Sequence, residues 1–264
     1  MSTEQRGIGS IEVGGQLLQV LTDADGPMML RDLAGSAGMS AAKAHPYLVS
    51  FMRLGLIEQD RATGRYELGP LALQMGLASM RRLNPVRIAT EAIGELVLRI
   101  NTTVALSVWG NHGPTVVRIE EGTGAVHVNM RVGSIMSLLG TATGRVFAAF
   151  LPPKMIETFI ESGLDRASVG DEAVRQMTRK QIDEAVAEIR EKGMARAVER
   201  PIPGVNAFSA PIFDHNGSIA LVITAIGPSH TFDADWDGPI AEEVRKCAAT
   251  ASLRLGFSSK LKAA

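Results

Sequence analysis

Three short helical patterns followed at once by a pair of strand-like runs occupy the start of this sequence, and few folds accommodate that order. Apolar residues recur every three or four positions in three segments of residues 11–54, and glycines lie between the second and third segments and after the third. Residues 56–68 then hold two strand-like runs around a turn that ends at Gly64. Two helices, a tight turn, a third helix and a hairpin predict a winged helix-turn-helix, which is a DNA-binding module.

A second and larger region follows a helical segment that ends at Asn84-Pro85, where proline disfavours further helix. Beyond this point amphipathic helical patterns are mixed with strand-like runs, which predicts an α+β, sensor-like fold. We therefore expect a winged helix-turn-helix domain over residues 11–69, a linker helix over 70–84 and a ligand-binding α+β domain over 85–257.

Composition and charge restrict the class of protein. Hydrophobic residues make up 45% of the chain and charged residues 21%, which is typical of a globular protein. The sequence has no apolar run long enough to span a membrane and no signal pattern. Its single cysteine, Cys247, lies in a helical pattern that favours burial. We therefore expect a cytoplasmic protein without membrane contact. Residues 1–83 carry eight basic and eight acidic side chains, so predicted DNA binding depends on where the charges lie.

The third helical segment carries the side chains expected to read DNA. Ser40 is its predicted N-cap, and the exposed residues that follow would enter the major groove, while arginines of the hairpin would contact phosphate or the minor groove. Pro46 removes a backbone donor inside this segment and predicts a kinked or late-starting helix. The candidate DNA-binding residues are Arg31, Ser40, Ala41, Lys43, His45, Tyr47, Arg61 and Arg65.

Motifs in both predicted domains occur in an order found in one family of regulators. They include residues 54–57 (LGLI), 63–69 (TGRYELG), 141–145 (TATGR) and 204–207 (GVNA). Over about residues 15–256 the chain resembles the IclR family of bacterial transcriptional regulators. The resemblance implies a GAF-like effector-binding domain, a homodimer or dimer of dimers, a palindromic double-stranded operator and control of nearby catabolic genes by a small molecule.

The same resemblance places the effector pocket at the helix that begins at Ala142. The first turn of a helix offers unpaired N–H groups that suit a carboxylate, so we expect an organic acid. Relatives that bind small hydroxy or oxo acids often have polar side chains or cysteine where this chain has Ala207 and Ile226, which extends the expected ligands to less polar, aromatic acids. The candidate effector-binding residues are Asn129, Leu138, Thr141, Ala142, Thr143, Gly144, Asn206, Ala207, Thr224 and Ile226.

Two alternatives stay open at this stage. Thr141 can be interpreted as an N-cap only, and Leu138, Ala207 and Ile226 as ordinary core residues. The alternative function is a small-molecule-binding enzyme or a sensor, with an N-terminal domain that serves dimerisation or partner binding. The five histidines include no pair at the i, i+4 spacing of a helical metal site, and the common nucleotide-binding and hydrolase motifs are missing, so we expect no enzymatic activity, metal or cofactor.

Overall fold

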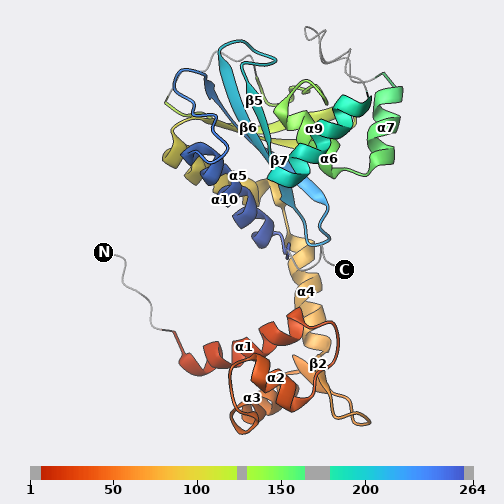
Figure 1. The fold of residues 1–264 in the computed structure, drawn as a ribbon. Helices are drawn as coiled ribbons and strands as arrows, with labels where there is room; N and C mark the ends of the chain where they lie inside the picture. The colour runs from red at the N-terminus through yellow and green to blue at the C-terminus, as the bar shows by residue number, and fades with distance from the viewer. Residues whose placement is uncertain (1–6, 124–129, 164–178, 259–264) are drawn as a thin grey trace. The chain divides into compact units, whose positions relative to one another are not determined.

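The computed structural model describes residues 7–123, 130–163 and 179–258, shown as a coloured ribbon in Figure 1. The chain divides into two compact units, Met1–Leu83 and Asn84–Ala264, each with its own hydrophobic core. Asn129, one of the residues predicted to bind the effector, lies outside the described residues.

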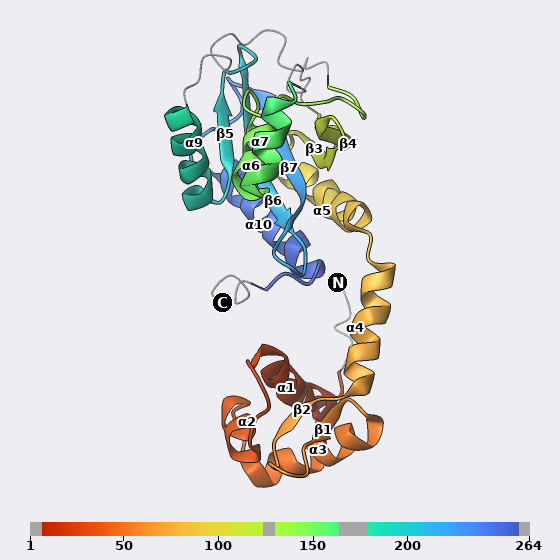
Figure 2. The same ribbon diagram turned by 90° about the vertical axis from the view of Figure 1, so that its right-hand side faces the viewer.

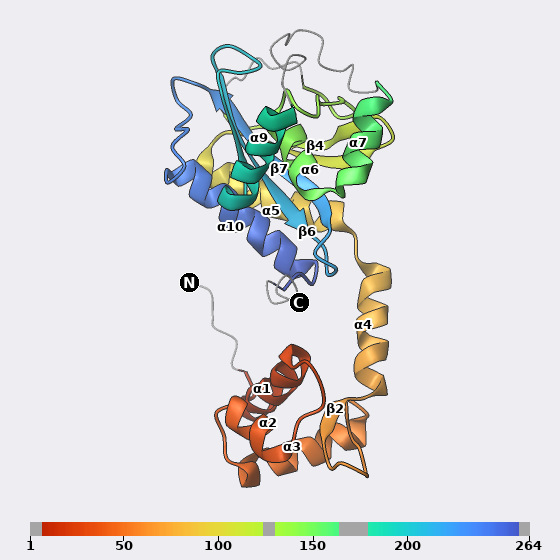
Figure 3. The same cartoon turned by 45° about the vertical axis from the view of Figure 1, so that its right-hand side comes forward.

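The first unit is built on three helices around a leucine-rich core. Its elements are α1 (Gly9–Asp23), α2 (Leu30–Ser36), α3 (Ala41–Leu54), β1 (Ile57–Gln59), β2 (Tyr66–Leu68) and α4 (Pro70–Arg82). Leu17, Leu33 and Leu48 come one from each of the first three helices and are fully buried. Figure 3 shows α1, α2 and α3 in succession, with the hairpin beside α3. This is the predicted helix-turn-helix domain, and the hairpin that follows it is the predicted wing.

Pro46 does not delay the start of α3, so this part of the sequence-based expectation is wrong. The helix begins at Ala41, directly after its cap Ser40, and continues past Pro46 to Leu54. The physical reason is the position of the proline. Pro46 is the sixth residue of the helix, so the one helical bond it removes is the one to the carbonyl of Ala42, one turn back.

The second unit is a five-stranded antiparallel sheet with helices on both faces. Its elements are α5 (Pro85–Ile100), β3 (Thr103–Gly110), β4 (Gly113–Glu120), α6 (Ala142–Phe150), α7 (Pro153–Glu161), α9 (Arg179–Lys192), β5 (Ala195–Val198), β6 (Val205–Phe213), β7 (Ile219–Pro228) and α10 (Pro239–Arg254). The strand order is β4-β3-β7-β6-β5. Figures 1 and 2 show α6, α7 and α9 on one face of the sheet and α5 with α10 on the other. The α+β prediction for this region is therefore confirmed.

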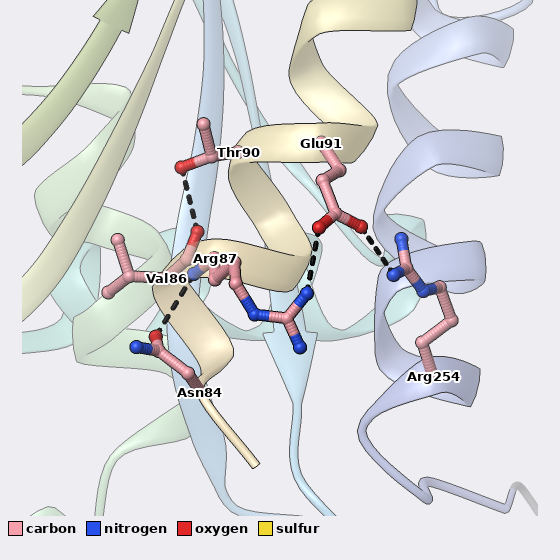
Figure 4. A network of polar contacts seen from close by, with 6 residues as sticks. All are labelled: Asn84, Val86, Arg87, Thr90, Glu91 and Arg254. Carbon is pink, nitrogen blue, oxygen red and sulfur yellow. Dashed lines mark hydrogen bonds and ion pairs between the residues drawn. The ribbon is translucent and has the colours of Figure 1, made fainter. Parts of the chain in front are cut away.

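Ion pairs join α5 to α10 at two places. The carboxylate of Glu91 accepts hydrogen bonds from Arg254 at 2.6 Å and from Arg87 at 2.9 Å, as Figure 4 shows. The hydrogen bond from Arg254 is the main reason that the pKa of Glu91 lies below its ordinary value. Two turns along α5, Arg99 pairs with Glu243 of α10 at 2.7 Å. Both pairs are partly exposed, so they fix how the helices align more than they stabilise the fold.

Candidate DNA interface and effector site

The residues predicted to contact DNA lie on α2, on α3 with its cap, and on the neighbouring hairpin. Ser40 caps α3 by accepting a hydrogen bond from the backbone N–H of Lys43 at 3.3 Å. Tyr47 packs against the hydrophobic core and against Gly14 of α1, so it is partly buried, as is Ala41. The remaining candidates have exposed side chains: Arg31, Ser40, Lys43, His45, Arg61 and Arg65.

The hairpin is held in shape by its own polar contacts. Asp60 accepts hydrogen bonds from the Thr63 hydroxyl at 2.7 Å and from the backbone N–H of Ala62 at 2.8 Å, and these bonds lower the pKa of the Asp60 carboxyl. The guanidinium of Arg65 donates to the carbonyl of Pro27 at 3.1 Å, which ties the hairpin to the segment before α2. Arg65 therefore has a structural contact besides any contact with DNA, whereas Arg61 lies in the exposed turn.

The predicted effector site centres on the start of α6. The Thr141 hydroxyl accepts a hydrogen bond from the N–H of Gly144 at 3.0 Å and donates one to the carbonyl of Ser137 at 2.8 Å. The N–H of Arg145 reaches the carbonyl of Thr141, which is the first regular helical bond. Thr141 is thus the N-cap, and helix geometry leaves the N–H groups of Ala142 and Thr143 without an acceptor inside the helix.

A chain of buried hydroxyl groups joins α6 to strands β7 and β6 of the sheet. The Thr143 and Thr224 hydroxyls lie 2.7 Å apart, and the Thr224 and Ser209 hydroxyls 2.8 Å apart. Ser107 of β3 is also buried, and its hydroxyl has no hydrogen-bond partner among the residues that the structure describes. The strand pairing explains the arrangement, because Ser209 stands directly opposite Thr224 in the sheet.

Apolar side chains complete this region. Leu138, Ala142, Ala207 and Ile226 belong to one buried cluster, so the structure brings these four predicted residues together. Asn206 differs from them, because its amide accepts from the N–H of Glu199 and donates to the carbonyl of Phe232. Both ends of its amide group are therefore used to hold the loops beside the sheet.

Gly144 has a geometric reason to be glycine. A Cβ placed on it would meet the carbonyl oxygens of Ser137 and Leu138, which are backbone atoms and cannot turn away. The segment before α6 therefore packs directly on the backbone of the helix. This close approach brings Leu138 and the Thr141 cap to the start of α6.

Two observations bear on catalysis and on membrane insertion. Within residues 7–123, 130–163 and 179–258, no three His, Cys, Asp or Glu side chains are grouped so that they could hold a metal ion. In the same ranges no helix has the length and apolar character needed to cross a bilayer.

Cys247 is buried in α10, and burial raises the pKa of its thiol to about 11, so the thiol is protonated at neutral pH.

Two family models match this chain and together cover most of it. A model described as the IclR helix-turn-helix domain matches residues 10–61, and one described as Bacterial transcriptional regulator IclR C-terminal matches residues 77–253. The chain belongs to the IclR family. Members of this family are transcriptional regulators with an N-terminal helix-turn-helix and a C-terminal effector-binding domain, so the predicted family, fold and general function are confirmed.

Individual IclR regulators match along nearly the whole chain. The crystal structure of Pseudomonas aeruginosa HmgR is 36% identical, has a TM-score of 0.85 and aligns over 96% of this chain and 100% of that one. The Glycerol operon regulatory protein of Streptomyces griseus is 28% identical over 95% of this chain and 98% of its own length. The DNA-binding transcriptional repressor YiaJ of Escherichia coli is 24% identical over 96% of this chain and 89% of its own.

Sequence reasoning missed two of the buried hydroxyls in this IclR chain. Ser209 and Ser107 are not among the predicted effector residues, although Ser209 lies two positions after Ala207 on the same strand. Side chains alternate between the two faces of a strand, so Ala207 and Ser209 lie on the same face of β6. This alternation is a signal in the sequence that could have identified Ser209. For Ser107 no comparable signal exists, because β3 is buried along most of its length.

Proposed function

We propose that this protein is a repressor that binds a palindromic operator through its N-terminal unit and releases it when an organic acid binds beside α6. In this proposal residues 11–69 bind DNA, residues 70–84 link the domains and residues 85–257 bind the effector. The observation that carries the proposal is the exposed, capped N-terminal half of α3 beside an arginine-bearing hairpin, in a chain of this family. The relative YiaJ, whose name includes the word repressor, supports the sign of regulation.

In the DNA complex, α3 occupies the major groove. Lys43 and His45 reach base edges or phosphates from the first turns of the helix, while Ser40 and the N–H groups near it face the backbone. Arg61 extends from the hairpin toward phosphate or the minor groove, assisted by Arg65. Because the first unit has no net excess of basic residues, the basic side chains of Lys43, Arg61 and Arg65 supply the electrostatic attraction to the DNA phosphates.

The effector carboxylate binds at the N–H groups of Ala142 and Thr143. The positive end of the α6 dipole favours an anion there. The hydroxyl chain Thr143–Thr224–Ser209 supplies polar partners, and Leu138, Ala207 and Ile226 supply an apolar wall. This apolar wall supports an acid with a substantial hydrocarbon part, aromatic acids included.

The protein is proposed to act as a dimer that pairs through α4. This helix has no buried residue, and three of its apolar side chains, Leu73, Leu77 and Met80, are 65%, 48% and 48% exposed. Their spacing of four and three residues places them on one face, as in paired helices. A symmetric pair of these faces would bring two DNA-binding units to the two halves of a palindrome.

Lys43→Ala is expected to weaken operator binding by at least tenfold, because a contact of this kind is worth about 1–3 kcal/mol in each half-site. The measurement is fluorescence anisotropy of a labelled duplex that carries the sequence the protein selects from a random library, at several salt concentrations. Lys180→Ala is the matched control, since Lys180 is exposed on α9 of the other unit and should leave affinity unchanged. Equal affinity and equal salt dependence for Lys43→Ala and wild type would count against the proposed interface.

A further inference from the structure

The geometry of α3 points to recognition of thymine methyl groups. We propose that Ala42 and Pro46 form an apolar contact line that reads the 5-methyl groups of thymines in each operator half-site. The inference rests on the proposed function, because it assumes that α3 enters the major groove. It adds a base-reading element that none of the predicted polar contacts provides.

The position of the line follows from which side of α3 is buried. Ala44 and Leu48 are fully buried in the core of the first unit. Two residues span about 200° around a helix, so Ala42 and Pro46 project from the side opposite those two. Both are exposed. Lys43 and His45, the polar candidates, consequently lie to either side of the line and not on it.

The chemistry of the line leaves it without hydrogen-bond donors. The side chains of Ala42 and Pro46 contain carbon only, and Pro46 also lacks a backbone N–H. Ser50, the next exposed residue one turn on, donates its hydroxyl proton to the carbonyl of Pro46 at 2.9 Å. Arg53 is exposed farther along, about 10 Å beyond Pro46 at 1.5 Å per residue, toward the end of the helix that is away from the bases.

Only one group on the major-groove edges of the base pairs suits such a surface. The thymine methyl is apolar, whereas the other recognition groups there are hydrogen-bond donors or acceptors. Placing a donor or acceptor against Ala42 or Pro46 would desolvate it without a partner, which disfavours other bases at that step. The line therefore selects thymine by attraction to the methyl group and by exclusion of unpaired polar groups.

The test uses the full-length protein and DNA in which only methyl groups change. The wild-type protein first selects its operator from a random duplex library. Each thymine of the selected half-site is then replaced by deoxyuridine, one position at a time and in both half-sites. Burial of one methyl-sized group corresponds to about fourfold in binding. At one or two positions, deoxyuridine in both half-sites should therefore weaken binding by about tenfold or more.

The same duplexes are then measured with two variants. Pro46→Ala removes most of the ring and keeps a helix-forming residue, so the penalty for deoxyuridine should shrink at the sensitive position. Arg53→Ala is the control, because it should lower affinity for all duplexes alike and leave that penalty intact. Deoxyuridine that costs nothing at every position, or that costs Pro46→Ala as much as wild type, would overturn the inference while leaving operator binding in place. Failure to select any sequence would instead overturn the proposed function.

Discussion

Gly144→Ala should destabilise the second unit by about 3 kcal/mol or more, because the added methyl group meets two backbone carbonyl oxygens. The carbonyls of Ser137 and Leu138 belong to the segment that the Thr141 cap holds against α6, so relief of the clash would displace this whole segment. Thermal unfolding followed by circular dichroism measures the loss. The proposed effector site should be lost together with the stability, because the displaced segment carries Leu138.

The matched control for this substitution is Gly94→Ala. Gly94 lies inside α5, and a Cβ built on it finds no atom within 4 Å. Alanine at this position should stabilise the protein by up to about 1 kcal/mol through its higher helix propensity. Equal melting temperatures for Gly144→Ala and Gly94→Ala would contradict the close packing of the segment before α6.

Leu77→Glu should lower operator affinity by about 10²- to 10⁴-fold, the factor gained when two linked modules bind one target. The substitution places a charge in the centre of the exposed apolar face of α4, where pairing with a second copy would bury it. Sedimentation velocity reports the mass, and anisotropy with the selected operator reports the affinity.

Met75→Glu introduces the same charge on another side of the same helix. Met75 is 58% exposed and lies two positions from Leu77, so it points away from the face that carries Leu73, Leu77 and Met80. This control should keep the mass and affinity of the wild type. If both variants behave alike, the proposed pairing face of α4 is wrong.

The sequence predicted local structure well and long-range partners poorly. The Ser40 cap is predictable because capping depends on a residue and its next few neighbours, and α3 begins at Ala41 as expected. The late start expected from Pro46 is wrong for a local reason, since this proline removes a single helical hydrogen bond and the Ser40 cap still sets the start of α3. The contact between Thr143 and Thr224 spans 81 residues, and it depends on the order of strands in the sheet. Periodicity shows which side chains face inward but does not give that order.

The candidate effector site illustrates the same limit. Thr143, Thr224, Ala207 and Ile226 were predicted through the family resemblance, and the structure brings them together at the start of α6. Their roles in binding stay a prediction. The hydrogen bonds of Asn206 to loop backbone emerge only from the folded chain, because they depend on how the two loops approach β6.

One titration tests whether an acid bound beside α6 controls DNA binding. A panel of organic acids, from two-carbon to aromatic, is first screened for those that raise the melting temperature of the full-length protein. Operator affinity is then measured with and without a stabilising acid at constant salt. The acid is expected to weaken operator binding by about tenfold or more, within the usual range of allosteric coupling. An acid that is bound at saturation yet leaves operator affinity unchanged would show that the site beside α6 does not control DNA binding.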